Sequence, residues 1–100
     1  MNKFSILGEI TALDGKRDEL ALILQDAEIL LLKNDLGCQV YSVNISEEHP
    51  NSVFVYEIWD DEKCHENSLQ NDEVLSLIMT AKPIISNMKR YFTFTSISKQ

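Results

Sequence analysis

The sequence predicts a single α+β domain over residues 1–100, in which an antiparallel sheet carries its helices on one face. Residues from about Lys16 to Lys33 place apolar side chains at helical spacing, which is typical of an amphipathic helix. Residues Val53–Trp59 instead form an almost continuous run of β-branched and aromatic residues, as in a buried strand. Taken in order, the segments read β-α-β-β-α-α-β, which is the ferredoxin-like split βαβ arrangement with its second helix in two pieces.

The first strand and the first helix are the most regular segments. The strand is predicted at about Lys3–Ala12, where Gly8 leaves space above the sheet for a ligand or a helix, or else marks a β-bulge. The helix follows to Lys33 and ends near Gly37, which can adopt a positive φ. Its core stripe comprises Leu20, Ile23, Leu24, Ala27, Leu30 and Leu31.

A hairpin is predicted next, with a second strand at about Cys38–Glu47 and a polar tip at Glu48–Asn51. The third strand, Val53–Trp59, is apolar on both faces, because Val53 and Val55 alternate with Phe54, Tyr56 and Ile58. A sheet with one solvated face should alternate more cleanly. We therefore expect a second copy of the chain to cover the open face in a homodimer.

The remaining elements are two short helices and a last strand. Asp60 and Asp61 end the third strand and provide capping oxygens for a helix that runs to Gln70. Asp72 is expected to cap the next helix, which Pro83 ends or kinks. The last strand is predicted at about Met88–Ser98, with Tyr91 and Ile97 alternating with Phe92 and Phe94.

Composition excludes several classes of partner. The net charge is −7 and the basic residues are scattered, which argues against nucleic acid and against anionic membranes as partners. There is no pattern typical of a signal peptide, and Leu20–Leu32 is too short and too often interrupted by polar residues to span a bilayer. We therefore expect a cytoplasmic protein.

Metal ions and nucleotide cofactors are not expected either. The soft metal ligands are Cys38, Cys64, His49 and His65, and none of them shows the spacing of a metal site. A cytosolic chain would keep both cysteines reduced. The sequence also lacks a Gly-rich phosphate loop and a dinucleotide fingerprint.

The short helix after the third strand carries the polar candidates for a site. Its inward stripe comprises Cys64, His65, Ser68 and Leu69, so an imidazole and a hydroxyl should turn inward. His65 is equally well explained as a half-buried residue at a helix–sheet seam. Glu57 is harder to explain structurally, because a carboxylate in an apolar strand must find a partner or shift its pKa.

The pattern Y-E-x-W-x-x-x-x-x-H-x-x-S-L, formed by Tyr56, Glu57, Trp59, His65, Ser68 and Leu69, resembles the antibiotic biosynthesis monooxygenase family. The resemblance extends to Gly15–Leu20, Gly37-Cys38 and Pro83–Ile85, and so covers nearly the whole chain. It implies a dimeric α+β barrel in a family that includes quinol monooxygenases and cofactor-free anthrone oxygenases. One departure is Ser68, which stands nine residues after Trp59, where many members have a histidine.

The resemblance also implies a reaction. A quinol- or anthrone-like aromatic would enter a pocket between helices and sheet, lose a proton to a base and react with O₂ without metal or flavin. We expect His65 to be the base, with Glu57 as the other candidate and Ser68 or a tyrosine as hydrogen-bond donor. Trp59 would form an aromatic wall, although plain packing also explains it; the other substrate-binding candidates are Tyr41, Tyr56 and Gly8.

Three other functions are weighed against oxidation. The haem-degrading relatives use an asparagine, a tryptophan and a histidine, and the chain has Gly8, Ser68 and Ile78 at the nearest corresponding places, which makes haem degradation a poor fit. Relatives that isomerise a small phosphorylated signal sugar would require cationic groups in the pocket, and neither Lys63 nor Lys82 is clearly placed there by the sequence. A non-catalytic small-molecule-binding or stress-related dimer is the third alternative.

Overall fold

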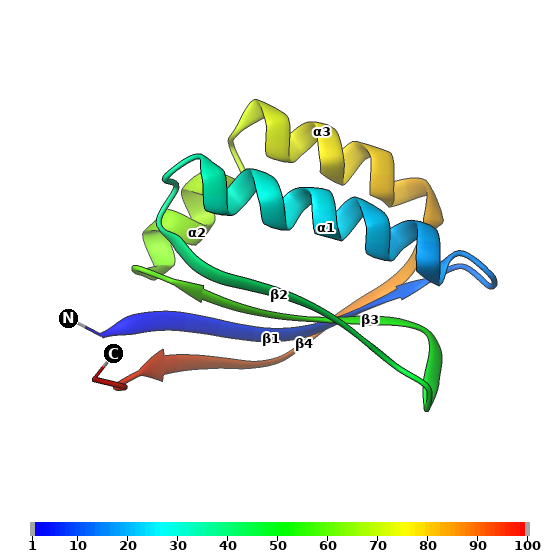
Figure 1. The fold of residues 1–100 in the computed structure, drawn as a ribbon, viewed down its shortest axis with the longest axis horizontal. Helices are drawn as coiled ribbons and strands as arrows, with labels where there is room; N and C mark the ends of the chain where they lie inside the picture. Colours follow the sequence, from blue (N-terminus) through cyan, green and yellow to red (C-terminus); the bar gives the residue numbers. More distant parts are fainter. Residues whose placement is uncertain (1, 100) are drawn as a thin grey trace.

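The computed structural model describes residues 2–99 and has the element order that the sequence predicts (Figure 1). Met1 and Gln100, the two ends of the predicted 1–100 domain, lie outside the described residues. The elements are β1 (Lys3–Ala12), α1 (Arg17–Lys33), β2 (Cys38–Ser46), β3 (His49–Trp59), α2 (Glu62–Ser68), α3 (Asp72–Ala81), the 3₁₀ turn η1 (Lys82–Ile84) and β4 (Ile85–Ser96).

The strands form one antiparallel sheet in the order β2-β3-β1-β4. The helices α1 and α3 lie side by side over one face, and α2 lies at the end of the sheet where β3 finishes (Figure 1). The other face, called the open face below, carries no helix. The predicted α+β class with a ferredoxin-like βαββααβ topology is therefore confirmed.

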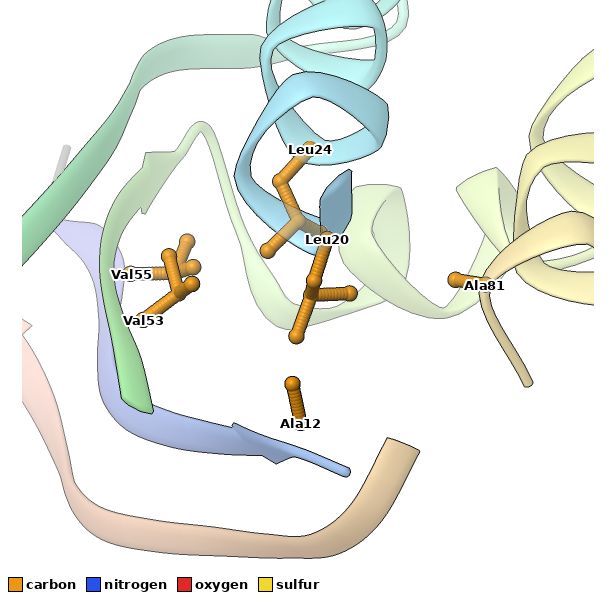
Figure 2. Close-up of a cluster of buried hydrophobic side chains, with 6 residues drawn as sticks. All are labelled: Ala12, Leu20, Leu24, Val53, Val55 and Ala81. Atoms are coloured by element: carbon orange, nitrogen blue, oxygen red, sulfur yellow. The ribbon is translucent and has the colours of Figure 1, made fainter. Parts of the chain in front are cut away.

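Two hydrophobic clusters join the helices to the sheet. In the first, Leu20 and Leu24 project from α1 toward Val53 and Val55 of β3 (Figure 2), with Ala12 and Ala81 completing the cluster. The second lies nearer α2 and comprises Leu31, Trp59 and Val74. The predicted stripe of α1 thus faces the core, whereas Leu22 and Ile29 on its flanks are exposed.

The β2–β3 turn is tighter than the sequence suggests. Ser46 pairs directly with His49, so the turn consists of residues 47 and 48 and the strand includes Pro50. Pro50 has no partner in either ladder, because β1 pairs with β3 only as far as Ser52 and the β2 ladder shifts register between Ile45–Val53 and Ser46–His49. No neighbour therefore requires the missing N–H group.

Other element ends also differ from the predictions, since α2 ends at Ser68 rather than Gln70 and β4 at Ser96 rather than Ser98. Asp61 caps α2 as expected and accepts a 2.8 Å hydrogen bond from the backbone N–H of Cys64. The α3 cap is Asn71 rather than Asp72, because Asn71 is the residue with extended backbone and accepts from the N–H groups of Glu73 and Val74. The last strand begins at Ile85 rather than Met88, since η1 ends at Ile84 and returns the chain directly to the sheet.

Alternation along β4 is broken at Tyr91. Leu7 pairs with Phe92, but the next residue, Gly8, pairs with Arg90, so Tyr91 is an additional residue in the ladder. Tyr91 donates a hydrogen bond to Glu9 on the open face, and Phe92 stacks on Phe94 there. The prediction that Tyr91 and Phe92 lie on opposite faces of the sheet is therefore wrong, because a β-bulge changes the alternation.

Within residues 2–99, no helix combines the length and the apolar character that crossing a membrane requires.

Candidate functional site

A pocket of about 770 Å³ lies between the helices and the sheet. Its walls include members of both hydrophobic clusters, among them Leu24, Leu31, Val55 and Val74. The volume is in the range of small-molecule sites, and an apolar lining with a few polar groups is their usual composition. Strand alternation and helix pitch bring most of the polar residues predicted from the sequence to this pocket.

Glu57 and Trp59 both face the pocket because they are two residues apart in β3. The indole Nε1 of Trp59 donates a 2.9 Å hydrogen bond to Oε1 of Glu57. Burial raises the pKa of Glu57, and the hydrogen bond from Trp59 and the positive charge of Arg90 oppose this. The carboxyl group is thus more basic than an exposed glutamate.

Trp59 packs in the core and also lines the pocket, so its position is compatible with both interpretations, plain packing and an aromatic wall. It is only 1% exposed and belongs to the second hydrophobic cluster, as the packing interpretation expects. It also lines the pocket, with its only hydrogen-bond donor already committed to Glu57. Trp59 can therefore offer a ligand its ring but no further donor.

Tyr41 lies directly opposite Glu57 in the β2–β3 ladder and lines the same pocket. Burial, followed by the negative charge of Glu57, raises the pKa of Tyr41. The phenol therefore keeps its proton at neutral pH and is a hydrogen-bond donor.

His65 projects from α2 and packs against two aromatic rings at one end of the pocket. Its ring centroid lies 5.3 Å from that of Trp59 in an edge-on arrangement and 6.1 Å from that of Phe4. Burial lowers the pKa of His65, and the positive charge of Arg90 lowers it further. The carboxylates that oppose these effects are Glu66 and Glu62. The imidazole is therefore neutral near pH 7 and can accept a proton.

Ser68 is buried and lines the pocket, but its hydroxyl is already used. The Oγ atom donates a 2.6 Å hydrogen bond to the backbone carbonyl of His65. Ser68 can therefore present only its oxygen as an acceptor, and the donor role suits Tyr41 better.

Gly8 lies at the β1–β4 bulge, as the second interpretation of this residue expects, and it also lines the pocket. A Cβ atom at this position would lie 3.3 Å from the carbonyl oxygen of Lys89. Tyr56 is the candidate that the structure does not bring to the pocket. It alternates with Glu57 and pairs with Leu7 and Ser42, and it is not among the lining residues.

Lys82, Lys89 and Arg90 are pocket-lining cations that the sequence alone does not place there. Lys82 follows α3 directly, whereas Lys63 is exposed on α2 and does not line the pocket. Regular alternation from Phe92 and Phe94 would place Arg90 on the open face. The bulge at Tyr91 reverses this placement, and no residue type in the sequence signals it.

Within residues 2–99, no group of three or more His, Cys, Asp and Glu side chains is arranged to hold a metal ion. Cys38 and Cys64 are free thiols. Burial raises the pKa of Cys38 to about 12, and a hydrogen bond with Asp61 raises that of Cys64. Both thiols are therefore protonated at neutral pH, which is the less nucleophilic form.

Comparison with known proteins identifies relatives of this fold. The model of the antibiotic biosynthesis monooxygenase family matches residues 3–78. A Chloroflexus aurantiacus protein provisionally named as such a monooxygenase has 23% identity and a TM-score of 0.85, over 98% of this chain and 96% of that one. A similarly named Caulobacter crescentus protein has 13% identity and a TM-score of 0.87, over 97% and 92% of the two chains. A third, from Deinococcus radiodurans, has 19% identity and a TM-score of 0.79, over 98% and 95%. No curated protein sequence matches the chain significantly.

Proposed function

Because the chain belongs to the antibiotic biosynthesis monooxygenase family, we propose that it oxidises a quinol- or anthrone-like aromatic with O₂, without metal or flavin. The observation that supports this most strongly is a neutral imidazole, His65, packed edge-on against Trp59 at the end of a large apolar pocket. A flat aromatic substrate requires such walls, and a reaction that begins by proton loss requires such a base.

The first step is proton transfer. A ring nitrogen of His65 accepts the phenolic or benzylic proton, and the electron pair of the broken bond stays on the substrate as a delocalised anion. Tyr41, which keeps its proton, donates a hydrogen bond to the developing oxyanion. The apolar walls exclude water and so strengthen this interaction.

The second step uses O₂ as the oxidant. The electron pair of the substrate carbanion reduces O₂ and forms a C–O bond, which gives a hydroperoxide after protonation. Loss of water then breaks the O–O bond and leaves a carbonyl on the substrate. One oxygen atom of O₂ remains in the product and the other leaves as water, so no external reductant is needed.

Glu57 is the second candidate base. Its raised pKa makes the carboxylate a better proton acceptor than an exposed one, and the hydrogen bond from Trp59 fixes its orientation. We prefer His65 as the base, because the form that accepts a proton is a neutral imidazole, which needs no compensating charge in an apolar pocket, whereas that form of Glu57 is an anion.

The active form is proposed to be a homodimer in the cytoplasm. The open face exposes Phe92 and Phe94, which lie in the same sheet as the half-buried Tyr56. A second sheet packed on this apolar face would complete an α+β barrel and, as an obligate interface, bury about 2,000 Å² or more.

Isomerisation of a small phosphorylated sugar is a second candidate, because Lys82, Lys89 and Arg90 provide the cationic lining that the sequence did not indicate. The surrounding walls are predominantly apolar, however, and would leave the hydroxyl groups of a sugar without partners. A binding protein without turnover is the third possibility and shares the same pocket.

Oxygen consumption distinguishes these functions. The purified protein is incubated with a panel of hydroquinones and anthrones in an oxygen electrode, with protein-free autoxidation subtracted. The proposal predicts O₂ uptake proportional to protein concentration for at least one aromatic, unaffected by a metal chelator. Tight aromatic binding without uptake would indicate a binding protein, and conversion of a phosphorylated sugar would indicate the isomerase.

A further inference from the structure

The β-bulge in β4 decides on which face of the sheet Arg90 lies. The ladder passes from the pair Leu7–Phe92 to the pair Gly8–Arg90, with Tyr91 as the additional residue. Tyr91 is held on the open face by its hydrogen bond to Glu9. Arg90 consequently lies among the residues that line the pocket and pairs with Gly8, where the backbone of β4 approaches closely.

Arg90 forms no ion pair with a carboxylate of the part of the chain that the structure describes. Within residues 2–99, ion pairs join Lys16 to Glu19 and Arg17 to Asp18 and involve no other cation. The chain has 16 acidic residues against nine lysines and arginines, so carboxylates for pairing are plentiful elsewhere. The charge instead acts on two groups of the pocket. It partly offsets the rise in the pKa of Glu57, and it adds to the fall in the pKa of His65.

We infer that Arg90 determines substrate specificity by binding the carboxylate of an aromatic acid whose rings occupy the apolar pocket. A planar guanidinium can hold a carboxylate through two parallel hydrogen bonds, and Arg90 has no competing acceptor of this kind. The inference rests on the proposed function in taking this pocket as the substrate site. It adds that the quinol or anthrone carries an ionised carboxyl group at the end of the pocket formed by β4.

Binding can be tested without turnover. Calorimetric titration compares naphthoate with naphthamide, two probes of the same ring system that differ in charge. The variants are Arg90→Gln, which removes the charge, and Arg90→Lys, which keeps it without the planar fork. Lys63→Gln is the matched control, because it removes one positive charge from an exposed residue that does not line the pocket. Circular dichroism verifies that each variant is folded.

The wild type and Lys63→Gln should bind naphthoate about tenfold more tightly than naphthamide. Arg90→Gln should lose this preference, and Arg90→Lys should keep part of it. Equal affinities for the two probes in the wild type, a preference that survives in Arg90→Gln, or no binding of either probe at millimolar concentration would each overturn the inference. If the preference depends on Arg90 but no quinol or anthrone, carboxylated or neutral, is oxidised, the inference stands and the proposed oxidation fails.

Discussion

Trp59 donates its indole N–H to the carboxylate of Glu57, which lies two residues earlier in the same strand, over 2.9 Å. The bond joins the largest buried side chain to the half-buried acid of the pocket. It fixes the orientation of the carboxylate and of the indole wall together. Glu57 thus lies in a strand of mostly apolar residues with Trp59 as its hydrogen-bond partner and with a raised pKa. Such a combination is common at functional sites.

Replacing Glu57 by Gln should change the pH dependence of stability. The pKa of Glu57 is raised from 4.5, so the folded state binds this proton more tightly than the unfolded state. Its contribution to stability is therefore complete below about pH 4.5 and is lost as the pH rises through the folded-state pKa. Glu57→Gln keeps an acceptor for Trp59 and removes this loss.

The difference in melting temperature between Glu57→Gln and the wild type should therefore become more positive between about pH 4 and pH 8. Each 1 kcal/mol corresponds to about 4–8 °C in a domain of this size. Thermal unfolding followed by circular dichroism at several pH values measures the difference. A difference that becomes more negative with rising pH would show that the ionised carboxylate stabilises the fold.

Replacing Gly37 by Ala should destabilise the junction between α2 and the turn before β2. Gly37 has a φ of 89°, and a Cβ atom there would lie 2.7 Å from Sγ of Cys64. Gly15→Ala is the matched control, because Gly15 has a similar φ of 77° but no atom within 4 Å of the added Cβ. The strain common to both costs about 1 kcal/mol, and the clash at Gly37 adds about 1–3 kcal/mol. Urea unfolding measures both, and equal losses would mean that Cys64 moves aside freely.

The open face gives a prediction about assembly. Sedimentation equilibrium at micromolar concentration should show about twice the 11.5 kDa mass of the chain. Phe92→Glu places a charge on this face and should shift the protein to the monomer. Met79→Glu is the control on the outer side of α3, where the side chain is 67% exposed, and should remain dimeric. A wild-type mass of one chain would leave the apolar open face without a partner.

The proposed base gives a prediction about the pH profile. The pKa of His65 is lowered from 6.5, so the imidazole stays neutral as the pH falls below 6.5 and is protonated only at its lower folded-state pKa. Turnover of any active substrate should follow the neutral form. His65→Gln should lower turnover by about 10²-fold and remove this acidic limb.

His49→Gln, on the exposed start of β3, should leave the profile unchanged. Full turnover in His65→Gln combined with loss of turnover in Glu57→Gln would instead assign the base to the carboxylate.

The fold could be predicted because the periodicity of the main elements is strong. Leu20, Leu24 and Leu31 are spaced for one helix face, and Val53 and Val55 for one strand face, and all of them are buried. The errors lie at element ends, where one hydrogen bond decides the outcome. Asn71 and Asp72 are both good capping residues, and only the path of the chain after α2 selects Asn71.

The site could be predicted as far as alternation holds. Glu57 and Trp59 share the pocket face because they are two residues apart, and the same rule sends Tyr56 to the open face. Arg90 could not be found in this way. Its position depends on an additional residue in β4 relative to β1, and such a bulge is a property of strand pairing that one strand's sequence does not encode.

The pocket beside His65 is proposed to transfer one oxygen atom of O₂ to an aromatic substrate without a cofactor. The most direct test is turnover of an active quinol or anthrone under ¹⁸O₂ by metal-free protein, with mass spectrometry of the product. Each product molecule should contain one ¹⁸O atom, and product should form at a rate that is proportional to protein concentration and about 10²-fold lower in His65→Gln. Product formed no faster than in protein-free buffer, or oxygen in the product derived from water, would contradict the proposal.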